Sequence, residues 1–427
     1  KQFCFLTLWA ASAALATGLA HPDGPSFGAE EQQAIMGCCG SGSAKDSSIP
    51  VTQQRRRLSI GQMENETKYT EAEVSAEDRG VIATLDEKNI LDLIETGDDD
   101  RKFSLGSDTD AELAKKKSFA EKKITTLGEP VDPRRSGIGF TCRKGLKPES
   151  PNQDSWVVLK LGDYSIYGVF DGHGKSGHHV SNFVKEALPK LIVKHKGFRT
   201  EEAAMVDMLK EVYKRTQNMI AAATRMSKIE AHMSGCTTTV LIHDHARKKL
   251  YVSWAGDSGA CIGAKKGENS PANAGLLPVE LTWDHKPEVK EERQRIERAG
   301  GRVVFDGYAN HRVYAKAGRY PGLNMSRALG DLMGHTDAGI SAEPTVKVYD
   351  IKAEDHVLII CSDGVWEFIP YDEAVRIVGE FPQTKAMNAA EKLAKEGWDR
   401  WIREEGGTVV DDITALVIYL DATTIQA

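Results

Sequence analysis

The fold is decided by one stretch of the chain, Tyr164-Ser-Ile-Tyr-Gly-Val-Phe-Asp171-Gly-His-Gly174. Residues 164 to 170 combine aromatic and β-branched types and predict a β-strand. Asp171, Gly172 and His173 follow where this strand ends, and Gly174 separates them from a helical pattern. A carboxylate beside glycines, which let backbone carbonyls approach a ligand, favours a site for a hard cation. Asp-Gly is also common at ordinary turns, so the motif alone leaves both interpretations open.

Aspartates recur at the ends of other predicted strands. The positions are Asp257 after residues 249–255, Asp363 after 356–361, Asp411-Asp412 before 413–420, and Asp154 before 155–161. Residues 155–161 and 164–170 predict a hairpin with its turn at Gly162-Asp163. We therefore expect these carboxylates to meet at one edge of a pair of sheets.

A cluster of carboxylates needs a counter-ion. Two unit charges 4 Å apart repel by about 4 kcal/mol at an effective dielectric constant of 20, so such a cluster either takes up protons or binds divalent cations. Oxygen ligands without cysteine favour Mg²⁺ or Mn²⁺ over Zn²⁺. Two such ions can activate a water for attack on phosphorus. The residue types therefore predict metal-assisted phosphoester chemistry, and both a phosphatase and a nuclease satisfy them.

The composition narrows this choice. The 427 residues are 41% hydrophobic and 27% charged, which is typical of a globular protein. The formal net charge of −7 argues against a nucleic-acid partner, and therefore against a nuclease, because such proteins present a basic face. The seven cysteines include no C-x-x-C pair, so neither a zinc site nor a disulfide framework is expected.

Two interpretations of the N-terminus exclude each other. Residues 1–35 begin with an apolar leader that resembles a signal peptide or short membrane anchor, and residues 1–20 would then direct secretion. Alternatively, Met36-Gly37-Cys38-Cys39-Gly40-Ser41 matches the pattern for N-myristoylation of Gly37, with palmitate on Cys38 and Cys39. Residues 1–35 would then be upstream sequence read through in frame, and the protein would be cytoplasmic with a membrane anchor. An inert tail is a third interpretation.

Residues 36–130 are polar and carry runs of charge, which predicts a mostly disordered arm. Arg55-Arg-Arg-Leu-Ser59 is typical of a substrate for a basophilic kinase, and Arg101-Lys-Phe-Ser104 is a weaker copy. Apolar residues between Val81 and Ile94 recur at partly helical spacing and predict a short helix that docks on the domain.

From residue 137 to 421 the composition is that of a globular domain. Further strand pairs are predicted at 237–243 with 249–255 and at 346–351 with 356–361, and helices at 175–195, 201–226 and 371–404. Strand pairs that alternate with helix pairs predict an α/β protein with mainly antiparallel sheets covered by helices.

Eight motifs occur in order over these residues: Pro151-Asn-Gln-Asp154, Val169-Phe-Asp-Gly-His-Gly174, Ser234-Gly-Cys-Thr-Thr238, Ala255-Gly-Asp-Ser258, Asp284-His-Lys-Pro287, Ser326-Arg-Ala-Leu-Gly-Asp331, Ser362-Asp-Gly364 and Asp411-Asp-Ile-Thr414. Together they resemble the PPM family, the type 2C metal-dependent Ser/Thr protein phosphatases. The resemblance implies two stacked antiparallel β-sheets flanked by helices on both sides. It also implies phosphoprotein substrates and hydrolysis by a water that bridges two Mg²⁺ or Mn²⁺ ions, with a weak third ion.

The resemblance assigns roles to individual residues. Asp171 would bridge both ions, the Gly172 carbonyl would bind the second, and Asp363 and Asp411 would hold the first. Asp257 would help to bind the third ion, and Asp154 would orient bound water from the outer shell. His173 would be the general acid that protonates the leaving oxygen. The Asp284-His-Lys-Pro287 motif is interpreted as a turn that precedes a helix, and residues 305–325 resemble a flap that shapes substrate choice.

The chain departs from the family pattern at a few positions. Gln153 stands where many members carry a metal-binding Glu, Asp412 replaces a frequent Asn, and Gly259 stands where Arg is common. Arg143 is our candidate for holding the substrate phosphate, because a guanidinium can donate two hydrogen bonds, although Lys144 and Lys147 are alternatives. A catalytically weak member that only binds partners is the rival hypothesis, and the presence of Asp171, Asp363 and Asp411 disfavours it.

Overall fold

The structure is a computed structural model that describes residues 75–83, 90–93, 102–109, 119–147, 151–266 and 275–420. The leader at 1–35, the acylation positions Gly37, Cys38 and Cys39, and the kinase site at Ser59 lie outside the described residues. Within the described ranges, no helix combines the length and the apolar character that a membrane crossing requires.

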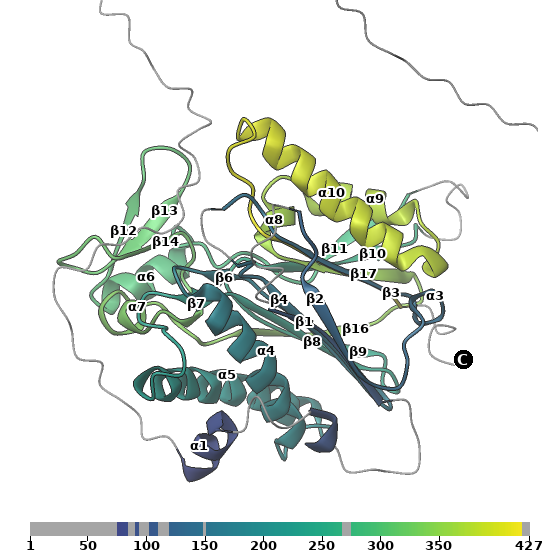
Figure 1. The fold of residues 1–427 in the computed structure, drawn as a ribbon, viewed down its shortest axis with the longest axis horizontal. Helices are drawn as coiled ribbons and strands as arrows, with labels where there is room; N and C mark the ends of the chain where they lie inside the picture. The colour runs from purple at the N-terminus through teal and green to yellow at the C-terminus, as the bar shows by residue number, and fades with distance from the viewer. Residues whose placement is uncertain are drawn as a thin grey trace, which may run out of the picture. The chain divides into compact units, whose positions relative to one another are not determined.

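Two antiparallel sheets form the centre of the domain (Figure 1). The seven-stranded sheet has the order β16 (Thr345–Asp350), β9 (Lys249–Ala255), β8 (Thr238–Asp244), β5 (Tyr164–Phe170), β4 (Ser155–Leu161), β1 (Lys102–Asp108) and β2 (Lys123–Gly128). The five-stranded sheet has the order β11 (Leu277–Glu280), β10 (Gly259–Ala264), β17 (Asp355–Cys361), β18 (Ile413–Tyr419) and β3 (Ile138–Arg143). This confirms the predicted α/β fold class of antiparallel sheets flanked by helices.

Three hydrophobic layers hold the domain together. One fills the space between the sheets, where Trp156 and Trp254 of the seven-stranded sheet meet Leu416 of the other. Another lies between the seven-stranded sheet and helices α4 (Gly177–Lys194) and α5 (Glu202–Arg225). The third lies between the five-stranded sheet and helices α9 (Tyr371–Gly379) and α10 (Ala386–Glu404). Because both faces of the central strands are covered, strands such as β5 are buried at every position.

The predicted hairpin forms with the predicted bounds, and its register fixes the site. Strand β4 pairs antiparallel with β5, so that Ser155 lies opposite Phe170. Gly162 in the turn has φ of 61°, a left-handed conformation that glycine adopts without a steric penalty. The residue before β4 and the residue after β5, Asp154 and Asp171, therefore lie at the same end of the sheet.

The expected pairing of residues 346–351 with 356–361 is wrong. Strand β16 pairs with β9 in the seven-stranded sheet, whereas β17 pairs with β10 and β18 in the five-stranded sheet. The residues between the two strands carry the chain from one sheet to the other. The alternation of apolar residues identifies a strand but does not identify its partner.

The described parts of the arm predicted at 36–130, which are residues 75–83, 90–93, 102–109 and 119–130, contain regular secondary structure that its composition does not indicate. Strands β1 and β2 extend the seven-stranded sheet, and helix α1 (Ala76–Ala83) and the 3₁₀ turn η2 (Ile90–Leu93) add buried residues to the helix-covered layer. Strand β2 is the edge of this sheet and is mostly exposed, so it requires few apolar residues, whereas β1 lies between β4 and β2 and is largely buried. Ser104 is buried inside β1, so the weaker kinase match is not accessible in the folded domain.

Shorter elements lie around the sheets. These are β6 (Gly172–His173), β7 (Gly235–Cys236) and β15 (Leu329–Gly330) in one small sheet; β12 (Arg302–Phe305), β13 (His311–Tyr314) and β14 (Pro321–Leu323) in another; helices α3 (Pro133–Ser136), α6 (Lys290–Arg298), α7 (Leu332–Asp337) and α8 (Asp363–Trp366); and η3 (Gln383–Lys385). Of these, α3 and η3 lie beside the start of β3, at the end away from β6 and β7. The first small sheet carries His173, and the second contributes to the wall of the site described next.

Candidate active site

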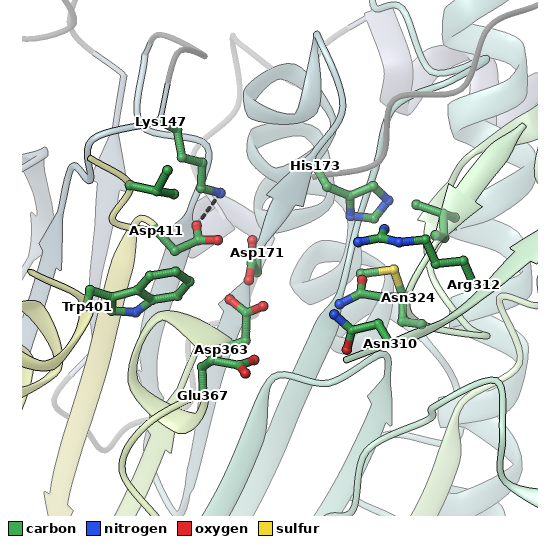
Figure 2. A pocket seen from close by; sticks show the side chains of 13 residues that line it. Lys147, Asp171, His173, Asn310, Arg312, Asn324, Asp363, Glu367, Trp401 and Asp411 are labelled. Atoms are coloured by element: carbon green, nitrogen blue, oxygen red, sulfur yellow. Dashed lines mark ion pairs between the residues drawn. The ribbon is translucent and has the colours of Figure 1, made fainter. Parts of the chain in front are cut away.

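A cavity of about 60 Å³ lies at the end of the sandwich where β5 and β17 stop. Its lining residues are Lys147, Asp171, His173, Asn310, Arg312, Leu323, Asn324, Met325, Asp363, Glu367, Trp401, Val409 and Asp411. Figure 2 shows the acidic side chains of Asp171, Asp363 and Asp411 close to one another, and His173 and Arg312 across from them.

The structure brings three of the predicted metal ligands to this cavity from distant parts of the chain. Asp171 follows β5, Asp363 begins α8 directly after β17, and Asp411 precedes β18. Burial, together with Asp154 and Asp363, raises the pKa of Asp171 well above its ordinary value. Burial, Asp411 and Asp257 do the same to the pKa of Asp363. The ionised cluster is therefore destabilised without additional positive charge.

Several buried carboxylate oxygens have no hydrogen-bond partner within the described part of the chain. They are Asp154 Oδ1, Asp257 Oδ1 and Asp363 Oδ1. Buried oxygens of this kind require an explanation, and a bound cation with oxygen ligands supplies one. Within the same described ranges, no three acidic, histidine or cysteine side chains are arranged so that they could hold a metal ion by themselves. The donor set fits Mg²⁺ or Mn²⁺ in its chemistry, with main-chain oxygens and water as further ligands.

Asp154 and Asp257 flank the cavity without lining it. Asp154 is fully buried, and its Oδ2 accepts hydrogen bonds from Ser362 Oγ at 2.8 Å and Thr414 Oγ1 at 2.7 Å. Burial and Asp412 raise the pKa of Asp154 to about 6. These contacts suit the outer-shell position that the resemblance implies.

The Asp284-His-Lys-Pro287 motif supports Asp257. Lys286 Nζ donates to Asp257 Oδ2. The Gly256 amide donates to His285 Nδ1 at 3.1 Å, and the His285 amide donates back to the Gly256 carbonyl at 3.0 Å. The motif therefore fixes the turn that carries Asp257, in keeping with a structural interpretation.

The cation beside the carboxylates is Lys147 and not Arg143. The Lys147 ammonium forms an ion pair with Asp411 and is 8% exposed. Burial alone would lower the pKa of Lys147, but Asp411, Asp412, Asp171 and Asp154 together raise it well above its ordinary value. Arg143 does not line the cavity: it donates to Glu391 Oε1 at 2.7 Å. Our choice of Arg143 is therefore not supported by the geometry, which favours the alternative Lys147.

His173 is held by a carboxylate to which sequence reasoning gave no role. Its Nε2 lies 2.6 Å from Asp331 Oδ2, and its Nδ1 has no partner within the described residues. Asp331 adopts a left-handed conformation with φ of 44°, which Asp tolerates better than most residues. A Cβ at Gly235 would collide with Asp331 Oδ2, so only glycine permits this approach. The signal was the motif that ends in Asp331, but its pairing with His173 spans 158 residues.

Close packing also explains Gly172 and Gln153. A Cβ at Gly172 would lie 2.6 Å from the carbonyl oxygens of both Gln153 and Gly177, so the chain has room only for glycine. The Gln153 side-chain amide donates to the Gly174 carbonyl at 2.6 Å, and its main-chain amide donates to Asp412 Oδ2 at 2.8 Å. Gln153 therefore ties the loop before β4 to the loop after β5.

The remaining wall comes from the region that resembles a flap. Arg312 on β13 lines the cavity with Asn310 and Asn324. The Arg312 guanidinium donates to the Gly322 carbonyl at 2.8 Å, which fixes its direction. Sequence reasoning identified this region as a whole but named none of these side chains, because nothing in its composition separates lining residues from others.

Comparisons with known proteins agree with this arrangement. The family model described as Protein phosphatase 2C matches residues 148–405. The chain is 34% identical to "Probable protein phosphatase 2C 48" of Oryza sativa subsp. japonica over 75% of this chain and 93% of that protein. It is 30% identical to "Probable protein phosphatase 2C 41" of Arabidopsis thaliana over the same shares.

A solved structure shows the same fold. The serine-threonine phosphatase 2C from Toxoplasma gondii superposes with a TM-score of 0.56 at 20% sequence identity, over 66% of this chain and 94% of that one. The family match, the relatives and the carboxylate-lined cavity lead to one conclusion: the chain belongs to the protein phosphatase 2C family of Ser/Thr protein phosphatases.

Proposed function

We propose that the protein hydrolyses phosphoserine and phosphothreonine in proteins by direct attack of water, and that it depends on Mg²⁺ or Mn²⁺. The observation that carries this proposal is a cavity lined by Asp171, Asp363 and Asp411 together with Lys147, Arg312 and His173, in which the buried Oδ1 of Asp363 has no partner among the described residues. Asp171, Asp363, Asp411 and the Gly172 carbonyl would hold two ions, and Asp257 would contribute to a third. Such ions would neutralise the carboxylates and lower the pKa of a water to make it a nucleophile.

The protein's own residues would bind and orient the phosphate. Lys147 and Arg312 place positive charge on two sides of the cavity, and both types donate hydrogen bonds to phosphate oxygens. Lys147 is already aligned by Asp411, and Arg312 by Gly322. Donors that are fixed before the substrate arrives stabilise charge without having to reorganise.

His173 would supply the proton for the leaving oxygen. In the doubly protonated ring, Nε2–H donates to Asp331 and the second proton is on Nδ1. Transfer of the Nδ1 proton to the leaving oxygen would release the serine or threonine hydroxyl. Asp331 fixes the orientation of the ring and compensates its positive charge. The phosphorus–oxygen bond breaks as the water oxygen bonds to phosphorus, so no phosphoenzyme forms.

The test is hydrolysis of a phosphothreonine peptide and of p-nitrophenyl phosphate by the wild-type protein with Mn²⁺, with Mg²⁺ and with EDTA. We expect turnover with either metal and none with EDTA or in Asp171→Asn. Equal turnover under all conditions would refute metal dependence. Peptide binding without turnover in every condition would instead support the binding-module rival, and cleavage of single-stranded DNA would support a nuclease.

A further inference from the structure

A lysine outside the family-matched residues reaches the back of the site. Lys122 directly precedes β2 and is 6% exposed. Its main-chain amide donates to the Cys142 carbonyl at 2.9 Å, next to the bridge between Glu121 and Arg143 of β3. The chain thus pairs with the five-stranded sheet at Lys122 and with the seven-stranded sheet immediately afterwards. Lysine is almost never buried to this extent without a specific set of partners.

The Lys122 ammonium is surrounded by acceptors at the start of β4. It donates to the Asp154 carbonyl at 2.5 Å, to Ser155 Oγ at 3.1 Å and to Asn182 Oδ1 at 3.5 Å. Ser155 Oγ in turn donates to Asn182 Oδ1 at 2.9 Å. An ammonium group has three protons, so these three acceptors account for all of them.

Other hydrogen bonds also fix the main chain at Gln153 and Asp154. The Gln153 carbonyl accepts from Ser181 Oγ at 2.6 Å, and the Asp154 amide donates to Asn152 Oδ1 at 2.9 Å. The Asp154 carbonyl is the remaining polar group of this turn, and Lys122 holds it with a charged hydrogen bond, which is stronger than a neutral one. Rotation of this peptide would move the Asp154 carboxylate away from Ser362 and Thr414.

We infer that Lys122 is a positioning residue for the carboxylate site, so that the residue directly before β2 supports the active site from outside the family-matched range. The inference rests on the proposed metal dependence. Lys122 acts through the main chain of Asp154 and touches no substrate. Mutation of an outer-shell residue that orients a metal site typically lowers metal affinity or activity about 10- to 100-fold.

Lys122 carries its charge under ordinary assay conditions. The pKa of Lys122 is lowered to about 8, mainly by burial. Lys185 acts in the same direction as burial, whereas Cys142, Asp154 and Asp412 oppose it. Experiments at about pH 7 therefore examine the charged form.

The test compares Lys122→Met with Lys190→Met, a second buried lysine. Lys190 is 4% exposed on α4 and pairs with Glu186 at 3.5 Å, away from Asp154. Isothermal titration calorimetry measures Mn²⁺ binding. A steady-state assay with p-nitrophenyl phosphate measures kcat and KM. We expect Lys122→Met to bind Mn²⁺ about tenfold more weakly and to lose kcat by a similar factor with KM changed less than about twofold. Lys190→Met should match the wild type in both.

A folded Lys122→Met protein that binds Mn²⁺ within twofold of the wild type would overturn the inference. If Lys122→Met does not fold, Ser155→Ala is the second variant, because it removes one of the three acceptors of the Lys122 ammonium. We expect Ser155→Ala to weaken Mn²⁺ binding about threefold, which is less than the effect expected from loss of the lysine. Unchanged Mn²⁺ binding by Ser155→Ala would also overturn it. A wild-type protein that binds Mn²⁺ but hydrolyses no phosphoester would refute the proposed function, while the calorimetry would still decide the role of Lys122.

Discussion

The two ends of the β-sandwich carry the same type of residue in different surroundings. At one end Asp244 closes β8, where its carboxylate accepts from the Tyr164 hydroxyl at 3.0 Å and pairs with Arg247 at 3.2 Å. At the other end Asp363 follows β17, and its buried Oδ1 has no partner among the described residues. Both aspartates lie at the end of a buried strand, Asp244 before a turn and Asp363 at the start of helix α8.

Asp244 and Asp363 therefore differ in how their carboxylate oxygens are paired, and not in their position at a strand end. An acid whose oxygens are all satisfied by protein donors holds the fold together. A buried acid with an unpaired oxygen reduces stability, and it persists because a ligand or ion completes it.

The largest effect is expected from one substitution made at both ends, Asp363→Asn and Asp244→Asn. Asp363→Asn should reduce kcat roughly 1,000-fold, because a charge that stabilises the transition state is lost. It should leave the metal-free protein at least as stable, since a buried charge is removed. Asp244→Asn should keep kcat within twofold and lose about 1–3 kcal/mol of unfolding free energy. Urea unfolding and phosphatase assays measure both, and loss of kcat in Asp244→Asn would contradict the comparison.

A smaller loss of activity is expected from Gly235→Ala. The new Cβ would displace the Asp331 carboxylate from His173, and misplacement of a catalytic group by about 1 Å can cost about 100-fold in rate. The expected result is a fall in kcat of that size with little change in KM. Gly80→Ala is the matched control, because a Cβ at Gly80 meets nothing within 4 Å, and alanine should stabilise α1 by up to about 1 kcal/mol. Normal kcat in Gly235→Ala would show that the Asp331–His173 contact is dispensable.

The stability of the catalytic end should depend on pH in the absence of metal. Burial and Asp412 raise the pKa of Asp154 to about 6, and burial with neighbouring carboxylates raises that of Asp171 well above its usual range. A carboxyl group whose pKa is higher when folded stabilises the fold below its unfolded pKa, and this contribution is lost as the pH rises through the folded pKa. We therefore expect the melting temperature in EDTA to fall from about pH 4 to about pH 7.

Saturating Mn²⁺ at about pH 7 should restore the melting temperature, because ligands of the folded state stabilise it. The control is Asp154→Asn, in which the fall in EDTA should be shallower. Scanning calorimetry over this interval is the measurement. A melting temperature in EDTA that rises with pH would mean that the ionised carboxylate cluster does not lower the stability of the folded protein.

The smallest effect is expected from Arg143→Ala. The pair of Arg143 with Glu391 is partly exposed, so its loss should change the unfolding free energy by less than about 1 kcal/mol. The kcat for p-nitrophenyl phosphate should stay within twofold of the wild type, whereas Lys147→Ala should raise KM. A large rise in KM for Arg143→Ala would restore our original candidate.

Patterns within short stretches of sequence were enough to predict individual strands and hairpins. The hairpin of β4 and β5 has the expected bounds because aromatic and β-branched residues, a glycine turn and both strand ends all appear within one short stretch, from Ser155 to Phe170. The choice between Arg143 and Lys147 was beyond these patterns. Arg143 is the last residue of β3, and the direction of Lys147 depends on Asp412, whose carboxylate accepts from the Gly145 amide at 2.8 Å. Contacts between segments that are far apart in sequence leave no periodic trace.

The same limit applies to Asp331 and to the strands of the arm. Asp331 reaches His173 only because Gly235 leaves room, which is a three-way contact that no single motif contains. Strands β1 and β2 are polar enough to resemble a disordered arm, and their order comes from pairing with β4 and from a few buried side chains such as Phe103. Tertiary context outweighs local composition in both cases.

The hydrogen bond from the Gln153 amide to the Gly174 carbonyl has a consequence for how this site can evolve. A glutamate side chain at this position has no amide proton and would place two hydrogen-bond acceptors against each other. A Gln153→Glu substitution would therefore break the hydrogen bond between the two loops and add a negative charge beside a cavity already lined by carboxylates. Such a change would become tolerable only after the neighbouring backbone had shifted, so the neutral side chain is entrenched here.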